Sequence, residues 1–165
     1  MVLRWARRPA AGRALAALLA ATLGSGGAPV AAQQVTEFGV MGIATASDPA
    51  LVVASAYGAI RTSRRTRISA GLGLGASDGR AAGRGELLAH FLLNPTRRSG
   101  VGIYGAGGVA AVGGSVDQGY LVLALGVEAR PGGRSGWFVE AGVGGGVRLA
   151  AGMRWRRRPP GWQDS

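Results

Sequence analysis

The chain has no cysteine and no lysine, and only one histidine among its 165 residues. Without cysteine there are no disulfides, no thiolate metal ligands and no cysteine nucleophile. A single histidine and scattered carboxylates do not form the ligand set of a transition-metal site, and the aspartates lack the spacing of a calcium loop. We therefore expect no metal and no cofactor, and a fold stabilised by its own packing.

The basic residues are all arginine, and the formal net charge is +11. A strongly positive chain is a candidate for nucleic-acid binding. However, only 6% of the residues are aromatic, and no aromatic-rich basic face is present on which bases could stack. The sequence predicts no nucleic-acid partner.

Long apolar runs are also missing. The N-terminus has four arginines before residue 14, an apolar segment over 14–23, and small residues at 30–32 before Gln33. Roughly ten apolar residues are too few for a membrane helix, which needs ~20. This layout predicts a signal peptide over residues 1–32, followed by a domain over 33–158 and a short tail over 159–165. The uncharged run 99–116 is rich in glycine, which disfavours a helix. We therefore expect a strand there, with a helix as the second alternative.

The turn sequences alternate between two chemistries along the chain. An acidic set consists of Ser47-Asp48-Pro49, Ser77-Asp78-Gly79 and Asp117-Gln118-Gly119. A basic set consists of Ser63-Arg64-Arg65-Thr66, Thr96-Arg97-Arg98-Ser99 and Gly132-Gly133-Arg134-Ser135. In an up-and-down β meander every second turn lies at the same end of the sheet, so this alternation predicts one arginine-rich end and one end with aspartate and glycine.

The segments between these turns alternate with a period of two, as strands do. Alternation is clearest over 67–76, 120–130, 137–143 and 147–155, and partial over 86–93. The segments 35–46, 51–62 and 101–112 are assigned as strands mainly because turns bracket them. About eight strands of about 9–11 residues predict an all-β fold, an antiparallel up-and-down barrel. Segments of this length suit a tilted strand that crosses a bilayer.

One face of these strands carries large apolar side chains, and the other carries glycine, alanine, serine and a few charges. Such a polar face is too small for a solvated exterior but suits a narrow lumen, so the apolar face is expected to contact lipid. The residues expected to form a lumen charge network are Glu86, His90, Glu128, Glu140, Arg148 and Arg154, with Arg130 as a further inward candidate. Buried charges need partners, so we expect pairing between glutamate and arginine, with His90 bonded to a carboxylate.

These features together resemble the small eight-stranded outer-membrane barrels of Gram-negative bacteria, of the type of the transmembrane domain of outer-membrane protein A. The resemblance is architectural and covers about residues 34–156. It implies outer-membrane lipid and the barrel assembly machinery as partners, and termini in the periplasm. Members usually end on an aromatic residue that the assembly machinery recognises, whereas this chain continues past Trp155 with Arg156-Arg157-Arg158 and a tail.

A catalytic alternative uses the single histidine. Glu86 precedes His90 by four residues on the same strand face, and Ser69 faces inward on the neighbouring strand, which suggests a Ser-His-Glu hydrolase. Outer-membrane lipid A deacylases resemble this idea, but their serine lies two residues from the histidine, where this chain has Leu92. The geometry is therefore incomplete, and we expect no catalytic residues.

The expected function is a structural or envelope-organising barrel, at most a narrow pore, because eight strands leave little lumen. Trp137 and Trp155 are expected to anchor the barrel at the lipid interface, with core packing as the alternative. A basic rim is expected from Arg64, Arg65, Arg97, Arg98 and Arg134. Two alternatives stay open: a lipid-modifying hydrolase that uses His90, and a secreted soluble β-barrel that binds a small apolar ligand.

Overall fold

The computed structural model describes residues 35–114 and 117–157. The predicted signal peptide (1–32) and C-terminal tail (159–165) lie outside these residues. Within the described residues, no helix is long and apolar enough to cross a membrane.

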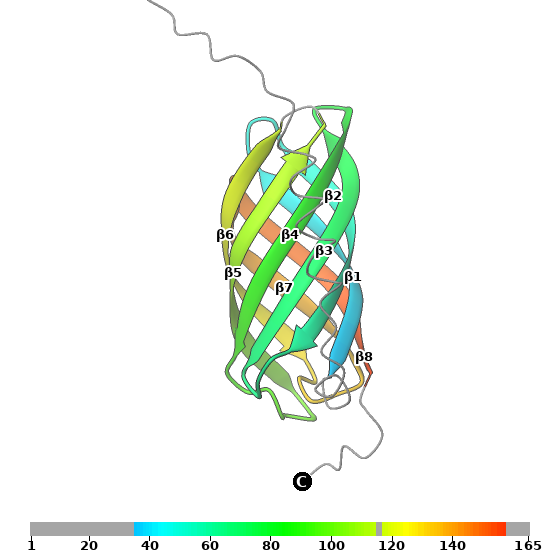
Figure 1. Ribbon diagram of the computed structural model, residues 1–165, viewed down its shortest axis with the longest axis vertical. Helices are drawn as coiled ribbons and strands as arrows, with labels where there is room; N and C mark the ends of the chain where they lie inside the picture. Colours follow the sequence, from blue (N-terminus) through cyan, green and yellow to red (C-terminus); the bar gives the residue numbers. More distant parts are fainter. Residues whose placement is uncertain (1–34, 115–116, 158–165) are drawn as a thin grey trace, which may run out of the picture. The chain divides into compact units, whose positions relative to one another are not determined.

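The described residues form eight antiparallel strands that close into one barrel in sequence order, with β8 paired back to β1 (Figure 1). The strands are β1 (Thr36–Ala46), β2 (Leu51–Arg61), β3 (Thr66–Ser77), β4 (Arg80–Leu92), β5 (Val101–Gly113), β6 (Gln118–Ala129), β7 (Ser135–Val143) and β8 (Val147–Arg157). The prediction of an all-β up-and-down barrel is confirmed, and the glycine-rich run after Ser99 forms β5 rather than a helix. Closure removes the exposed edges that an open sheet would leave.

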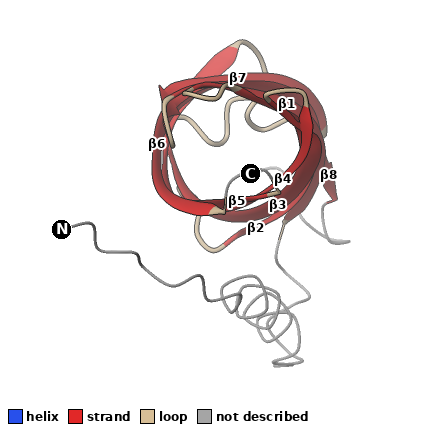
Figure 2. Cartoon of the chain, turned by 90° about the horizontal axis from the view of Figure 1, so that it is seen from above, coloured by secondary structure: helices blue, strands red, loops and turns tan. Residues whose placement is uncertain are grey.

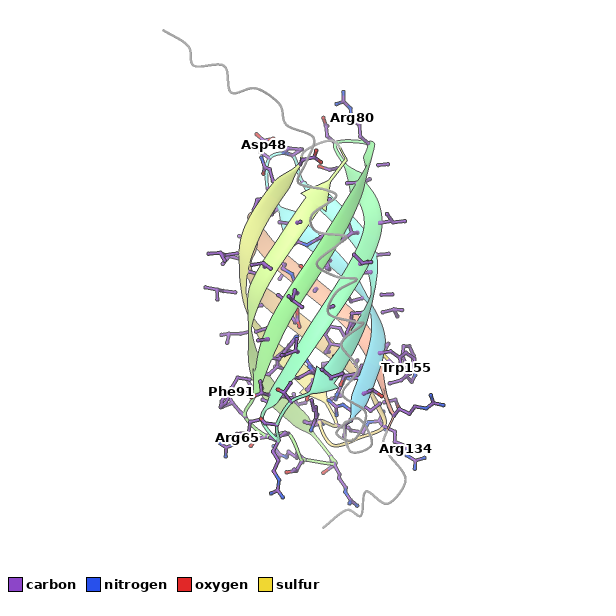
Figure 3. All side chains as sticks on the ribbon, in the orientation of Figure 1. Asp48, Arg65, Arg80, Phe91, Arg134 and Trp155 are labelled. Atoms are coloured by element: carbon purple, nitrogen blue, oxygen red, sulfur yellow. The ribbon has the colours of Figure 1, made fainter. Side chains whose placement is uncertain are left out.

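The turns fall at the two ends as the sequence pattern predicts. The first strand begins where the last one ends, because Thr36 is paired with Arg157, and the three basic turns lie at this end. Figure 3 shows Arg65 and Arg134 at one end, with Asp48 and Arg80 at the other. Asp78 and Gly79 have positive φ angles of 51° and 68° in the tight turn between β3 and β4, a conformation that aspartate and glycine tolerate well.

Along most of each strand the side chains alternate between the lumen and the outside. Leu74 and Leu121 are each 78% exposed on the outer face, whereas the charged Arg148 and Glu128 are 0% and 1% exposed inside. This is the inverse of a water-soluble barrel, which buries apolar residues and exposes polar ones. Many of the side chains in Figure 3 project outward from the strands along the height of the barrel.

The lumen is filled by side chains and partly covered by loops. Figure 2, viewed along the barrel, shows loop segments lying within the ring of strands. A group of apolar inner side chains lies towards the end with the acidic turns; it includes Ile43, Leu51, Val53, Ala82 and Val112. Charged side chains lie beside this group, since Val112 is paired with Arg84, and they continue towards the arginine end. They are the most unusual feature of the interior because full burial of arginine and glutamate is rare.

Candidate functional site: the charged lumen

The buried charges form two groups at different heights. The group nearest the arginine end, here named the Glu37 cluster, consists of Glu37, Arg67, Glu128, Arg154 and Arg156. Glu37 lies at its centre: its Oε1 is 2.8 Å from Nη1 of Arg67, and its Oε2 is 2.6 Å from Nε of Arg156 and 3.4 Å from Nη1 of Arg154. The side chains of all five are at most 3% exposed.

The second carboxylate of this cluster, Glu128, is shared in the same way. One oxygen, Oε2, lies 3.3–3.5 Å from all three arginines. Two carboxylates therefore face three guanidinium groups, so the cluster has an excess of one positive charge. Tyr57 adds a neutral hydrogen bond, donated by its hydroxyl to Glu37 over 3.1 Å.

The second group, here named the Glu86 cluster, lies closer to the acidic turns and consists of Arg84, Glu86, Glu140 and Arg148. Arg148 donates to both oxygens of Glu86, from Nε over 3.2 Å and from Nη2 over 3.0 Å, and from Nη1 to Glu140 over 2.7 Å. Arg84 donates from Nε to Glu86 over 2.8 Å. Two carboxylates face two guanidinium groups, so the charge is balanced, and the two-pronged contact is the geometry in which arginine binds carboxylates most strongly.

A polar bridge, formed by Arg67, His90 and Ser69, extends from the Glu37 cluster towards the Glu86 cluster. Arg67, part of the Glu37 cluster, donates from Nη2 to Nδ1 of His90 over 3.1 Å, and the other ring nitrogen of His90 lies 2.8 Å from the hydroxyl of Ser69. A cavity of about 20 Å³ at this level is lined by Arg67, His90 and Glu140, among others, and has room for roughly one water molecule. The lumen is therefore packed between the two clusters.

The structure brings Ser69 and His90 together but not in the order that a hydrolase needs. Arginine is always a donor, so Nδ1 of His90 must accept from Arg67 and the ring proton lies on Nε2, facing Ser69. His90 then donates to the serine instead of accepting its proton. Glu86, expected as the third member, is bonded to Arg84 and Arg148. This arrangement does not supply a general base to Ser69.

The expectation that His90 is bonded to a carboxylate is wrong, because the interior places Arg67 opposite its ring. Arg130 is also not an inward charge: it is exposed, with φ of 46°, in the turn between β6 and β7. That turn folds over the arginine end of the lumen. The buried Pro131 accepts hydrogen bonds at its carbonyl oxygen from Arg156 and, over 3.2 Å, from Arg61.

The structure places the six residues of the expected network, Glu86, His90, Glu128, Glu140, Arg148 and Arg154, on the inner face, all buried. Sequence reasoning missed Glu37, Arg67, Arg84 and Arg156 as members, although period two places each on the inner face of its strand. It also missed Tyr104, which donates from its hydroxyl to Glu140 over 2.8 Å.

The residues expected to face the surroundings lie on the outer face or in turns. Trp137 and Trp155 are 43% and 38% exposed, and Trp155 stacks on Phe38 of β1 with ring centroids 5.5 Å apart. The residues expected to form the basic rim, Arg64, Arg65, Arg97, Arg98 and Arg134, are all exposed in turns at the same end. In the described residues no three acidic or histidine side chains converge as metal ligands.

Comparison with known proteins supports the fold class that this geometry defines, the small eight-stranded outer-membrane type of barrel. The N-terminal β-barrel domain of OprF from Pseudomonas aeruginosa superposes with a TM-score of 0.63 and 11% sequence identity, over 76% of this chain and 98% of that domain. At this identity the likeness establishes the fold. No protein-family model matches the chain, and no curated protein matches it in sequence.

Proposed function

We propose that this chain is an integral outer-membrane β-barrel with a structural or envelope-organising role. The observation that carries the proposal is the inverted polarity of the barrel. Large apolar side chains such as Leu72, Leu123 and Leu125 are 64–71% exposed on the outer face, whereas the interior contains both ion-pair clusters. An apolar outer surface of this extent favours lipid over water.

The sidedness follows from the ends of the barrel. In barrels of this fold class the termini face the periplasm, so the arginine end would lie at the inner leaflet and the turns with Asp48 and Asp78 would face the outside. Trp137 and Trp155 lie near the arginine end of their strands, at the height where amphipathic aromatic rings are stable at a lipid interface. The barrel assembly machinery is the expected partner during insertion.

The packed lumen favours a closed barrel over a pore. The Glu37 cluster, the Arg67–His90–Ser69 bridge and the Glu86 cluster lie in succession along the interior, and the turn around Pro131 covers one end. An ion would have to separate several buried charge pairs on its way through, and each separation is costly. We therefore expect no general conductance.

The alternatives receive less support. A secreted soluble barrel would leave the outer apolar face in water. A hydrolase that uses His90 would need a proton acceptor for Ser69, and the hydrogen bond from Arg67 removes it.

Cell fractionation tests the proposal directly. The full chain expressed in a Gram-negative host is expected in the outer-membrane fraction, to require detergent for release, and to migrate faster on a gel when it is not boiled. Protease added to whole cells should cut at the loop of Asp78 and spare the loop of Arg97. Recovery of the protein in the periplasmic supernatant without detergent would contradict a membrane role, and single-channel currents in a planar bilayer would contradict the closed lumen.

A further inference from the structure

The outer face of the barrel has a hollow whose floor is formed by glycine and alanine. It has a volume of about 640 Å³ and lies over β4, β5, β6 and β7. Its floor consists of Ala89, Gly105, Gly107 and Ala141, while Leu123 and Leu125 rise beside it. A hollow in a lipid-facing surface must be filled by a lipid segment or a partner, because an empty one loses dispersion contacts.

The register of the strands shows that this groove leads away from the arginine end. One row of paired residues crosses it: Thr66, Phe91, Gly105, Leu125 and Ala141, from β3 to β7. Thr66 is the first residue of β3 at the arginine end, whereas Ala141 is two residues from the far end of β7. Because barrel strands tilt, the row runs diagonally from the rim into the apolar height of the barrel.

Larger side chains flank the groove on both sides. The row nearer the arginine end contains Ile103, Val127 and Val139, and a row on the other side contains Leu87, Val109 and Leu121. Between these rows the floor at Ala89, Gly105 and Gly107 is bordered across the strands by Phe91 on one side and by Leu123 and Leu125 on the other. The groove is therefore a short recess along β5 that can hold part of a hydrocarbon segment.

The rim end of the groove is positively charged. Arg65 directly precedes Thr66, and the Arg65 carbonyl accepts a hydrogen bond over 2.7 Å from the backbone of Leu92, next to Phe91. Arg97 lies in the turn that follows β4, and neither the 62–65 turn nor the 93–100 turn contains an acidic residue. Figure 3 shows Arg65 and Phe91 close to each other at the same end.

We propose that this groove binds one anionic phospholipid, with its phosphate at Arg65 and part of one acyl chain over Gly105 and Gly107, between Phe91 of β4 and Leu125 of β6. The inference rests on the proposed membrane function. The charge at the rim end selects this occupant over a second copy of the barrel, because two copies in contact here would bring their arginine turns together. Guanidinium groups bind phosphate oxygens by charge-assisted hydrogen bonds.

The test uses the folded full-length protein reconstituted in vesicles of phosphatidylcholine with a minor fraction of phosphatidylglycerol, followed by detergent release and native mass spectrometry. The wild-type barrel is expected to retain one phosphatidylglycerol. Arg65→Gln should lower the preference for phosphatidylglycerol over phosphatidylcholine about fivefold, the effect of one arginine near anionic lipid. Gly105→Leu should abolish retention of either lipid, because the new side chain fills the floor; a Cβ there lies 3.9 Å from Leu125, an ordinary contact.

Two matched variants separate a specific site from general effects. Arg80→Gln removes the same charge at the opposite end, and Gly42→Leu adds the same side chain to the open outer face of β1, where a Cβ meets nothing within 4 Å. Both should retain the lipid. Equal retention in all variants would show unselective lipid contact and overturn the inference, and a dimer that Gly105→Leu disrupts would assign the groove to a second copy. Failure of the wild-type protein to insert into vesicles would contradict the proposed function as well, whereas insertion without selectivity contradicts this inference alone.

Discussion

The two ion-pair clusters occupy the same lumen, but they balance their charges differently. In the Glu86 cluster each charge has an opposite charge of its own, and Arg148 contacts Glu86 with two donors. In the Glu37 cluster two carboxylates pair with three arginines, and the distances between nitrogen and oxygen range from 2.6 to 3.5 Å. The cluster next to the arginine end is thus short of negative charge, and the cluster deeper in the barrel is not.

This difference shows which groups each cluster depends on. Where cations are in excess, every carboxylate contacts several arginines. The loss of one carboxylate should therefore lower the free energy of unfolding more than the loss of one arginine. Where the charges are balanced, the loss of either sign leaves an unpaired buried charge. The clusters should therefore respond differently to neutralisation, and urea unfolding of the barrel in lipid vesicles can measure each response.

The largest effect is expected for Glu37→Gln. The substitution keeps the size of the side chain but leaves Arg67, Arg154 and Arg156 with the single carboxylate of Glu128. We expect the free energy of unfolding to fall by about 5 kcal/mol, the upper end for an uncompensated buried charge. Asp48→Asn, at an exposed turn, serves as the control and should change stability by less than about 0.5 kcal/mol. Equal effects of the two variants would mean that Glu37 contributes no more than a surface carboxylate.

A smaller loss, about 3 kcal/mol, is expected for Arg148→Met. Glu86 would keep its contact with Arg84, and Glu140 would keep the hydroxyl of Tyr104, so each carboxylate retains one partner. The same unfolding experiment measures this loss. An Arg148→Met barrel as stable as the wild type would show that the balanced cluster is not a stabilising element.

The smallest effect is expected for Arg154→Met, about 1 kcal/mol. This change loses hydrogen bonds to the backbone oxygens of Ala129 and Arg130 but removes the excess positive charge of the Glu37 cluster. The comparison between the clusters depends on this variant. If Arg154→Met destabilises the barrel more than Arg148→Met does, the excess of cations is not what distinguishes the two clusters.

Much of the architecture was predictable because its signals are local. Alternation with period two assigns each side chain to one of two faces without knowledge of any other strand, and this placed Glu86, Glu140 and Arg148 inside. The alternating turn chemistry gave the strand order and the two ends. Glu37 was missed because β1 is otherwise apolar or small on both faces, so its single glutamate did not stand out. Arg156 was missed because it lies within a run of three arginines after Trp155, where the alternation with period two is no longer visible.

The partners of the buried charges were not predictable. Glu37 and Arg156 are 119 residues apart and meet only because β8 closes onto β1. The inward side chains of one strand also reach across the lumen to strands that are not their neighbours, as Arg148 of β8 reaches Glu86 of β4. For the same reason His90 met Arg67 rather than a carboxylate.

By itself the sequence determined the strands, their faces and the two ends of the barrel, because turn propensity and side-chain alternation act over a few residues. Only the tertiary structure decided that two carboxylates pair with three arginines in the Glu37 cluster, and that two carboxylates pair with two arginines in the Glu86 cluster. It also decided that small residues from β4, β5 and β7 lie together in a hollow lined at one end by Thr66, next to Arg65. Both depend on the register around the closed barrel, which brings together residues that no local pattern relates.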